Sequence, residues 1–180
     1  MYSSYIEEIE QLYNTDYKKI RNGTKLYGHL FDDRWQTHIY KPLSLDDIKI
    51  LEEEYGELPN TYKELLQTMN GCYLFDLIQI AGKREISKGM SREEQIRQPS
   101  SLRDIKPYLG KKKLAEGLLV FASSMVSDSF FAFNKDENVL QIGYKKLDII
   151  KVYESLHELL KEIMLEGAEM VKNGEYIDFY

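Results

Sequence analysis

Apolar residues recur at spacings of three and four over the first twenty residues, from Tyr2 to Ile20. This period is typical of an amphipathic helix, and Asn22-Gly23 supplies a residue pair that suits a helix exit. From Leu26 to Tyr40 the helical period is lost, which indicates a short strand or an irregular segment. We therefore predict an N-terminal helical extension over residues 1–41.

The next stretch predicts two short helices joined by a tight link. Ser44 can cap the first helix while Asp47 reaches back to the cap, and Gly56 ends that helix. Pro59 is placed to open the second helix, and Asn70-Gly71 provides its exit. The apolar positions that we expect to be buried are Leu45, Ile48, Leu51, Tyr55, Tyr62, Leu65, Leu66 and Met69.

The remaining apolar segments read as strands. The almost continuously apolar run Cys72–Ile80 has the length of one central strand. Ser155 opens a last helix with a capping box. Further strands are expected at 118–122, 130–133 and 139–144, with an edge strand at 147–152. Short links between sequential strands favour an antiparallel sheet, so we predict a single α+β domain over 1–180, mainly antiparallel with helices packed against the sheet.

Residues 83–117 differ from their surroundings in charge. They contain ten Lys/Arg and five Asp/Glu, a net charge of +5, so the rest of the chain carries −11. We interpret this segment as a basic surface insertion with one or two short helices, at Ser91–Glu94 and Ser101–Leu109. Nucleic-acid binding is one reading, but only Tyr108 is aromatic in the segment. A solvated loop or a second partner contact fits better.

Composition narrows the class of protein. With 43% apolar and 30% charged residues, the chain is typical of a globular domain. Its net charge of −6 argues against nucleic acid or an anionic membrane as a partner and suits a basic protein. A single cysteine, no apolar run of membrane-spanning length and an acidic N-terminus without signal-peptide features favour a cytoplasmic location.

The reactive residue types form no catalytic set that we recognise. His29 and His38 are nine residues apart, and His157 has no second ligand near it on its helix. Cys72 reads as a buried, inert thiol, and Ser127 beside Asp128 has no histidine assigned to it. We find no nucleotide-binding glycine motif. We therefore expect no enzyme activity, no cofactor and no metal.

Two groups of residues are candidates for a protein-binding surface. Between Asp32 and Glu57 the net charge is −5, although the helix start and a solvated helix face would also explain these acids. Trp35, Tyr40 and the tail Tyr176–Tyr180 are candidates because Trp and Tyr dominate interface hot spots. The candidate binding residues are Asp32, Asp33, Trp35, Asp46, Asp47, Glu53, Glu54 and Glu57.

The segment from Leu43 to Gly71 resembles the opening of the SUKH superfamily, which includes a domain of a yeast cell-wall-synthesis regulator and many bacterial immunity proteins. The resemblance extends over the later strands and the last helix, from about Pro42 to Glu166, with Ser127-Asp128 where members often have Gly-Asp. Its motifs are Leu43-Ser44-Leu45-Asp46-Asp47-Ile48, Leu51-Glu52, Tyr55-Gly56, Leu58-Pro59, Tyr62-Lys63, Leu65-Leu66 and Met69-Asn70-Gly71.

This resemblance implies a binding protein and not a catalyst. Bacterial members are typically immunity proteins that bind and neutralise a toxin made beside them, often a nuclease. An acidic binder would be steered toward the basic surface of such a toxin. We therefore expect an immunity protein with a basic cognate toxin as its partner. The alternative is a regulatory or scaffolding protein-binding module without a toxin.

Overall fold

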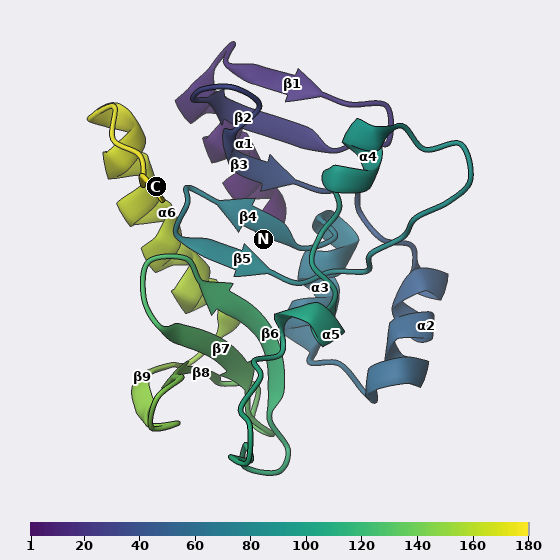
Figure 1. Cartoon of the computed structure of the whole chain (residues 1–180), viewed down its shortest axis with the longest axis vertical. Coiled ribbons are helices and arrows are strands. Elements are labelled where there is room, and N and C mark those ends of the chain that lie inside the picture. The colour runs from purple at the N-terminus through teal and green to yellow at the C-terminus, as the bar shows by residue number, and fades with distance from the viewer. Residues whose placement is uncertain (180) are drawn as a thin grey trace.

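The computed structural model describes residues 1–179, which form one curved sheet with helices on both faces (Figure 1). Within these residues nine strands pair antiparallel, in sequence order from β1 to β9. The predicted α+β class with a mainly antiparallel sheet is confirmed. The elements are α1 (Tyr2–Tyr13), β1 (Tyr17–Lys19), β2 (Lys25–His29), β3 (Trp35–Ile39), α2 (Leu45–Tyr55), α3 (Asn60–Thr68), β4 (Cys72–Leu74), β5 (Ile78–Ile80), α4 (Arg92–Ile96), α5 (Leu102–Ile105), β6 (Leu119–Ser124), β7 (Ser129–Phe133), β8 (Val139–Gly143), β9 (Ile149–Tyr153) and α6 (Leu156–Lys172).

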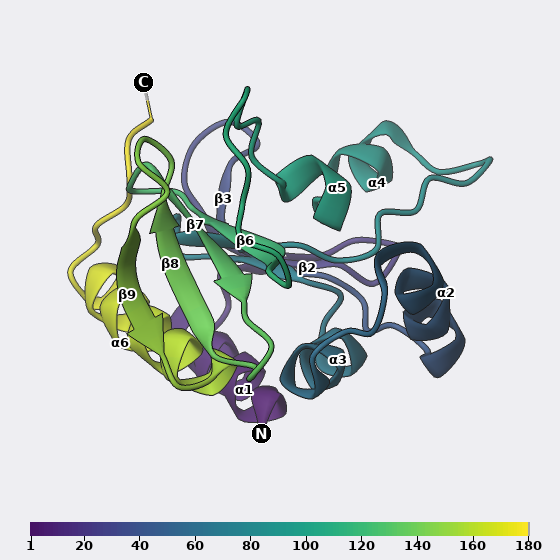
Figure 2. The same cartoon turned by 90° about the horizontal axis from the view of Figure 1, so that it is seen from below.

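The helices are distributed unequally over the sheet. Figure 2 shows α1, α3 and α6 on one face, α4 and α5 on the other, and α2 at the side away from α6. The main core lies under α1, α3 and α6, where the side chains of Ile9, Tyr62, Leu66 and Phe75 are completely buried. The opposite face is covered mainly by residues 83–117, so this insertion determines what part of that face reaches solvent.

The two helices of the hairpin form as the sequence predicts, except that α3 ends at Thr68 with an extended Met69 as its C-cap, before the predicted exit at Asn70-Gly71. Ser44 and Asp47 exchange side-chain-to-backbone hydrogen bonds of 3.2 Å in each direction, which is a capping box. Gly56 ends α2 at a φ of +86°, a conformation that favours glycine. Pro59 precedes α3 as its N-cap. Leu45 departs from the prediction: it is the first residue of α2 and its side chain is 64% exposed.

The prediction of a helix as far as Ile20 is wrong, because α1 ends at Tyr13. Asn14 takes a left-handed φ of +53°, and the chain then turns into β1. Asp16 takes part in the sheet instead, because its carbonyl accepts a 3.0 Å hydrogen bond from the Gly28 N–H. Short polar side chains before β1 disfavour helix continuation. Residues 1–41 thus contribute one helix and three sheet strands, so the description of a helical extension is corrected.

The prediction of one strand over Cys72–Ile80 is also wrong, because the segment folds back as the β4–β5 hairpin. Phe75 and Asp76 adopt φ values of +54° and +61°, which is the pattern of a two-residue hairpin turn. The turn closes with a 2.8 Å hydrogen bond from the Leu77 N–H to the Leu74 carbonyl. Asp76 is buried and its carboxylate is bound by other parts of the chain, which makes this unusual turn sequence possible.

The remaining predicted elements are present, although the short helix predicted over Ser101–Leu109 is confined to α5, Leu102–Ile105. The turn at 134–138 joins β7 to β8, and β9 is the edge strand expected near 147–152. Ser155 caps α6 by accepting a hydrogen bond from the Glu158 N–H. Ser91 and Ser101 cap the two short helices of the basic insertion. Within residues 1–179 no helix is both long and apolar enough to cross a membrane.

Candidate functional site

The structure separates the predicted acidic residues into two groups. Asp32, Asp33 and Trp35 lie in the β2–β3 loop and at the start of β3. The other five lie on or directly after α2, beyond the opposite end of β3 (Figure 1). The eight residues therefore do not form one surface. The α2 residues are Asp46, Asp47, Glu53, Glu54 and Glu57.

The side chains of the β2–β3 loop are engaged within the loop and with the basic insertion. The Asp33 carboxylate lies 3.4 Å from Nη2 of Arg97, which reduces the negative charge that the loop presents. The ring of Trp35 packs against that of His29, with 4.9 Å between ring centroids. Asp32 has a φ of +50° and its carbonyl oxygen lies 2.9 Å from Nε2 of His29. These contacts give the loop a structural role.

On α2, the predicted binding residue Asp47 has a structural role within the fold. The Asp47 carboxylate caps the helix and pairs with Lys83 at 2.5 Å, and the bonds from Lys83 and Ser44 lower the pKa of Asp47 to about 2. Asp46 differs, because its side chain is 90% exposed.

The predicted acidic residues on α2 other than Asp47 are exposed, and Asp46 among them lies 3.6 Å from Lys49 Nζ. Glu53, Glu54 and Glu57 are exposed, and Ile50, one turn before Glu53 and Glu54 on the helix, is 48% exposed. Asp46, Ile50, Glu53 and Glu54 follow the helical period, so they lie on one side of α2, and Glu57 follows directly after the Gly56 C-cap. We call these five residues the α2 outer face. It combines carboxylates with an exposed apolar side chain.

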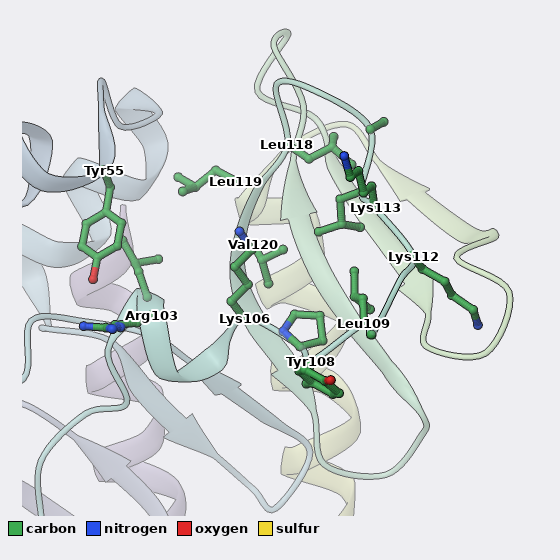
Figure 3. Close-up of a pocket in the computed structure, with 15 residues that line it drawn as sticks. Tyr55, Arg103, Lys106, Tyr108, Leu109, Lys112, Lys113, Leu118, Leu119 and Val120 are labelled. Atoms are coloured by element: carbon green, nitrogen blue, oxygen red, sulfur yellow. The ribbon is translucent and has the colours of Figure 1, made fainter.

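A hollow of about 710 Å³ lies between α5, the chain that follows it and the start of β6 (Figure 3). We call it the insertion groove, because most of its lining comes from the basic insertion. Its remaining lining comes from the end of α2 and from β6. The lining residues are Tyr55, Leu102, Arg103, Lys106, Pro107, Tyr108, Leu109, Gly110, Lys112, Lys113, Leu114, Ala115, Leu118, Leu119 and Val120.

The insertion groove has an apolar floor and a cationic rim. Leu102 and Val120 are buried at its base, and further leucines of the loop and of β6 are partly buried around them. Four cationic side chains belong to the lining, and none of the described lining residues is acidic. Lysine and arginine commonly bury their stems along apolar surface while the charged ends stay in water. The four cations are Arg103, Lys106, Lys112 and Lys113.

Tyr55 joins the insertion groove to the α2 outer face. In Figure 3 its ring lies beside Arg103 at one end of the groove. Burial raises the pKa of Tyr55, and the adjacent Glu54 carboxylate raises it further. A neighbouring hollow is lined by Ile50, Glu54, Tyr55 and Arg103 among other residues. A negative and a positive surface therefore meet at this tyrosine.

The reactive residue types lie apart from one another. Cys72 is completely buried, and burial raises the pKa of its thiol, so the thiolate form is disfavoured. Burial, together with the Arg97 guanidinium, lowers the pKa of His38 to about 3, so its ring is neutral at ordinary pH. His157 Nδ1 lies 2.7 Å from the Tyr5 hydroxyl. No group of three His, Cys, Asp or Glu within residues 1–179 is arranged to hold a metal ion.

A buried ion pair was not foreseen from the sequence. Arg34 Nη2 lies 2.7 Å from the Asp76 carboxylate, which is completely buried. Arg34 also donates a 2.5 Å hydrogen bond to the Ile177 carbonyl and lies over the rings of Tyr176 and Phe179. The candidate tail is therefore docked on the chain's own fold as far as residue 179, and Tyr180 lies outside the described residues. The one sequence feature that pointed to this pair is Asp76 itself, an acidic residue within the apolar run Cys72–Ile80.

Comparison with known proteins gives one family match. The family model described as SMI1 / KNR4 family (SUKH-1) matches residues 42–162, about two thirds of the chain. The matched region contains α2, the insertion groove and all strands from β4 to β9. No curated protein and no solved structure matches the chain.

Proposed function

The chain belongs to the SMI1 / KNR4 family (SUKH-1), and from this membership we propose that it is an immunity protein, which binds and neutralises a cognate bacterial toxin by protein–protein contact. The observation that carries the proposal is the family match over residues 42–162. The surface chemistry supports it, since the exposed charged groups gather on a helix face and around a groove. Neutralisation then results from covering the toxin's active region, without any reaction at the chain's own side chains.

We assign docking to the α2 outer face, because Asp32 and Asp33, although exposed, lie beyond the opposite end of β3 and Asp33 pairs with Arg97. α2 stands at the side of the molecule away from α6 (Figures 1 and 2), and its residues Glu53 and Glu54 are exposed. A nuclease toxin needs a basic surface to attract phosphate, so an acidic face can steer toward it and compete with its substrate. We propose a basic toxin as the partner and the cytoplasm of the producing cell as the location.

The test is a neutralisation experiment. The chain and the toxin encoded by a neighbouring reading frame are co-expressed, and growth is compared with expression of the toxin alone. We expect restored growth and recovery of a complex of the two purified proteins. Growth that is not restored for any adjacent toxin, with the chain expressed and folded, would support the regulatory or scaffolding alternative instead.

A paired charge reversal tests the α2 outer face. Glu53→Lys with Glu54→Lys should weaken toxin binding at least tenfold, because two carboxylates facing a basic partner become repulsive. Both residues are exposed, so the midpoint of urea unfolding should hardly change. The matched control is Glu166→Lys with Glu169→Lys on α6, which alters net charge equally on another face. Equal loss in both variants, or no loss in the first, would move the docking face elsewhere.

A further inference from the structure

The insertion groove is a second charged surface, opposite in sign to the α2 outer face. We propose that it binds an extended segment of the partner protein in which carboxylates alternate with apolar side chains. This inference rests on the proposed protein-binding function and adds which part of the partner the chain recognises. Its basis is the combination of an apolar floor, a cationic rim and the absence, among the described residues, of a carboxylate paired with any rim cation.

Within residues 1–179, two of the ten basic residues of the insertion form ion pairs, and four of the eight that form none line the groove. Lys83 and Arg97 belong to the same basic segment, and each forms an ion pair with an aspartate of the fold. Among the described residues, no carboxylate lies within ion-pair distance of the four rim cations. Lys112 alone has a hydrogen bond, to the Lys145 carbonyl. In a chain of net charge −6, leaving these cations unpaired around one hollow favours an anionic occupant.

The floor of the groove requires an occupant with apolar side chains. Leu102 and Val120 form its base, and Leu109, Leu114 and Leu118 surround them. The volume of about 710 Å³ lies within the range of ordinary ligand sites, roughly 300–1,000 Å³. A free phosphate or a purely acidic peptide would leave the apolar side chains of the floor exposed to water. A segment that alternates acidic and apolar residues satisfies both the rim and the floor.

Nucleic acid fits these observations less well. A single-strand binder uses several aromatic side chains as stacking platforms along a basic track. The groove has two aromatic residues, and the ring of Tyr55 is partly buried against the fold while Tyr108 is 97% exposed at the other end. Beyond the groove the chain is acidic, so a longer phosphate backbone would be repelled.

The groove and the α2 outer face together define an orientation. They meet at Tyr55, so a partner with a basic surface next to an acidic–apolar segment fits in one direction only. Complementary charge patterns of this kind fix register and suppress wrong partners more than they add affinity.

The test uses the full chain and three fluorescently labelled seven-residue peptides, measured by fluorescence anisotropy. The first alternates Asp or Glu with Leu or Phe, the second replaces its acids by Lys, and the third replaces its apolar residues by Ser. We expect saturable binding of the first only, and the binding should weaken as salt concentration rises. A seven-nucleotide single strand serves as the nucleic-acid probe.

Two variants of equal net charge locate the peptide. Lys106→Glu with Lys113→Glu on the rim should weaken binding of the first peptide at least tenfold. Lys161→Glu with Lys172→Glu, exposed on α6 at the opposite face, should change it less than twofold. Tyr108→Ser, which removes an exposed ring, tests the apolar component and should also weaken binding. Far-ultraviolet circular dichroism and thermal unfolding confirm that the variants fold.

The inference is overturned by absence of peptide binding to the folded chain. It is also overturned if the lysine peptide or the oligonucleotide binds more tightly, or if both double variants lose binding equally. These outcomes are separate from the growth test. Restored growth without peptide binding removes the groove assignment and keeps the immunity function, while peptide binding without toxin neutralisation does the reverse.

Discussion

Removing the Arg34 side chain should loosen the C-terminal tail and destabilise the whole domain. Asp76 accepts hydrogen bonds from Arg34 at 2.7 Å, from the Tyr73 hydroxyl at 2.8 Å and from the Ile177 N–H at 3.3 Å. Its side chain is 0% exposed, and that of Arg34 is 18% exposed. The substitution Arg34→Met keeps much of the apolar stem but leaves the carboxylate without its cation.

The expected loss follows from this geometry. Breaking a buried pair from one side costs about 3–5 kcal/mol, because the remaining charge is buried without compensation. The two neutral donors from Tyr73 and Ile177 remain, so we place the loss for Arg34→Met toward the lower end, at about 3 kcal/mol. Asp76→Asn should also destabilise. The double variant should cost less than the sum of the single losses, with a coupling of about 1–3 kcal/mol.

Urea unfolding of the four proteins in this cycle measures the coupling. Hydrogen exchange of the tail supplies an independent readout, because Arg34 and Asp76 both bind the backbone of Ile177. We expect faster exchange over residues 175–179 in Arg34→Met, with protection in β7 and β8 lost only through global unfolding. A coupling below about 0.5 kcal/mol, the scatter expected for independent sites, would refute the reasoning, as would unchanged tail exchange.

Three further predictions concern the core and its response to pH. Leu66→Ala should lower the free energy of unfolding by about 2–5 kcal/mol in urea titrations, because this side chain is completely buried; a loss below 1 kcal/mol would contradict that placement. Gly167→Ala should cost about 1–3 kcal/mol, because a Cβ would overlap the Phe75 ring, whereas the exposed-site control Gly174→Ala meets no atom and differs only in backbone strain. His38 has a folded pKa of about 3 against an ordinary 6.5, so the unfolded chain binds a proton at a higher pH than the folded chain does. Stability should therefore fall by about 2 kcal/mol from pH 7 to pH 5, and His38→Gln should remove that contribution; an unchanged pH dependence would contradict a ring that stays neutral in the fold.

Local signals account for the parts of the fold that the sequence predicted. The Ser44 cap, the Gly56 exit and the turn before β8 depend on residues within a few positions of one another, so their patterns can be read directly. The failures involve distant partners. The turn at Asp76 depends on Arg34, forty-two positions earlier in the chain. Tyr17 fits a helical spacing and is nonetheless 55% exposed on β1.

In the candidate site, too, local sequence patterns were readable and contacts between distant residues were not. Closeness in sequence suggested one acidic cluster, but β3 separates Asp33 from α2. The structural role of Asp47 depends on Lys83, which belongs to the insertion. The insertion groove exists only because Tyr55, α5 and β6 come together, and no local pattern encodes their meeting. The net charge of the insertion was visible in the sequence, whereas which of its cations stay unpaired depends on tertiary structure.

Because the strands pair in chain order, the segments that connect them can vary in length without changing the sheet. Because β5 and β6 are hydrogen-bonded neighbours, the long segment between Ile80 and Leu119 leaves and re-enters the sheet at the same place. Closing such a segment instead of a five-residue link costs only about 2 kcal/mol of chain entropy, since the cost rises with the logarithm of length. A segment of different length or sequence could therefore replace residues 83–117 while every strand keeps its register.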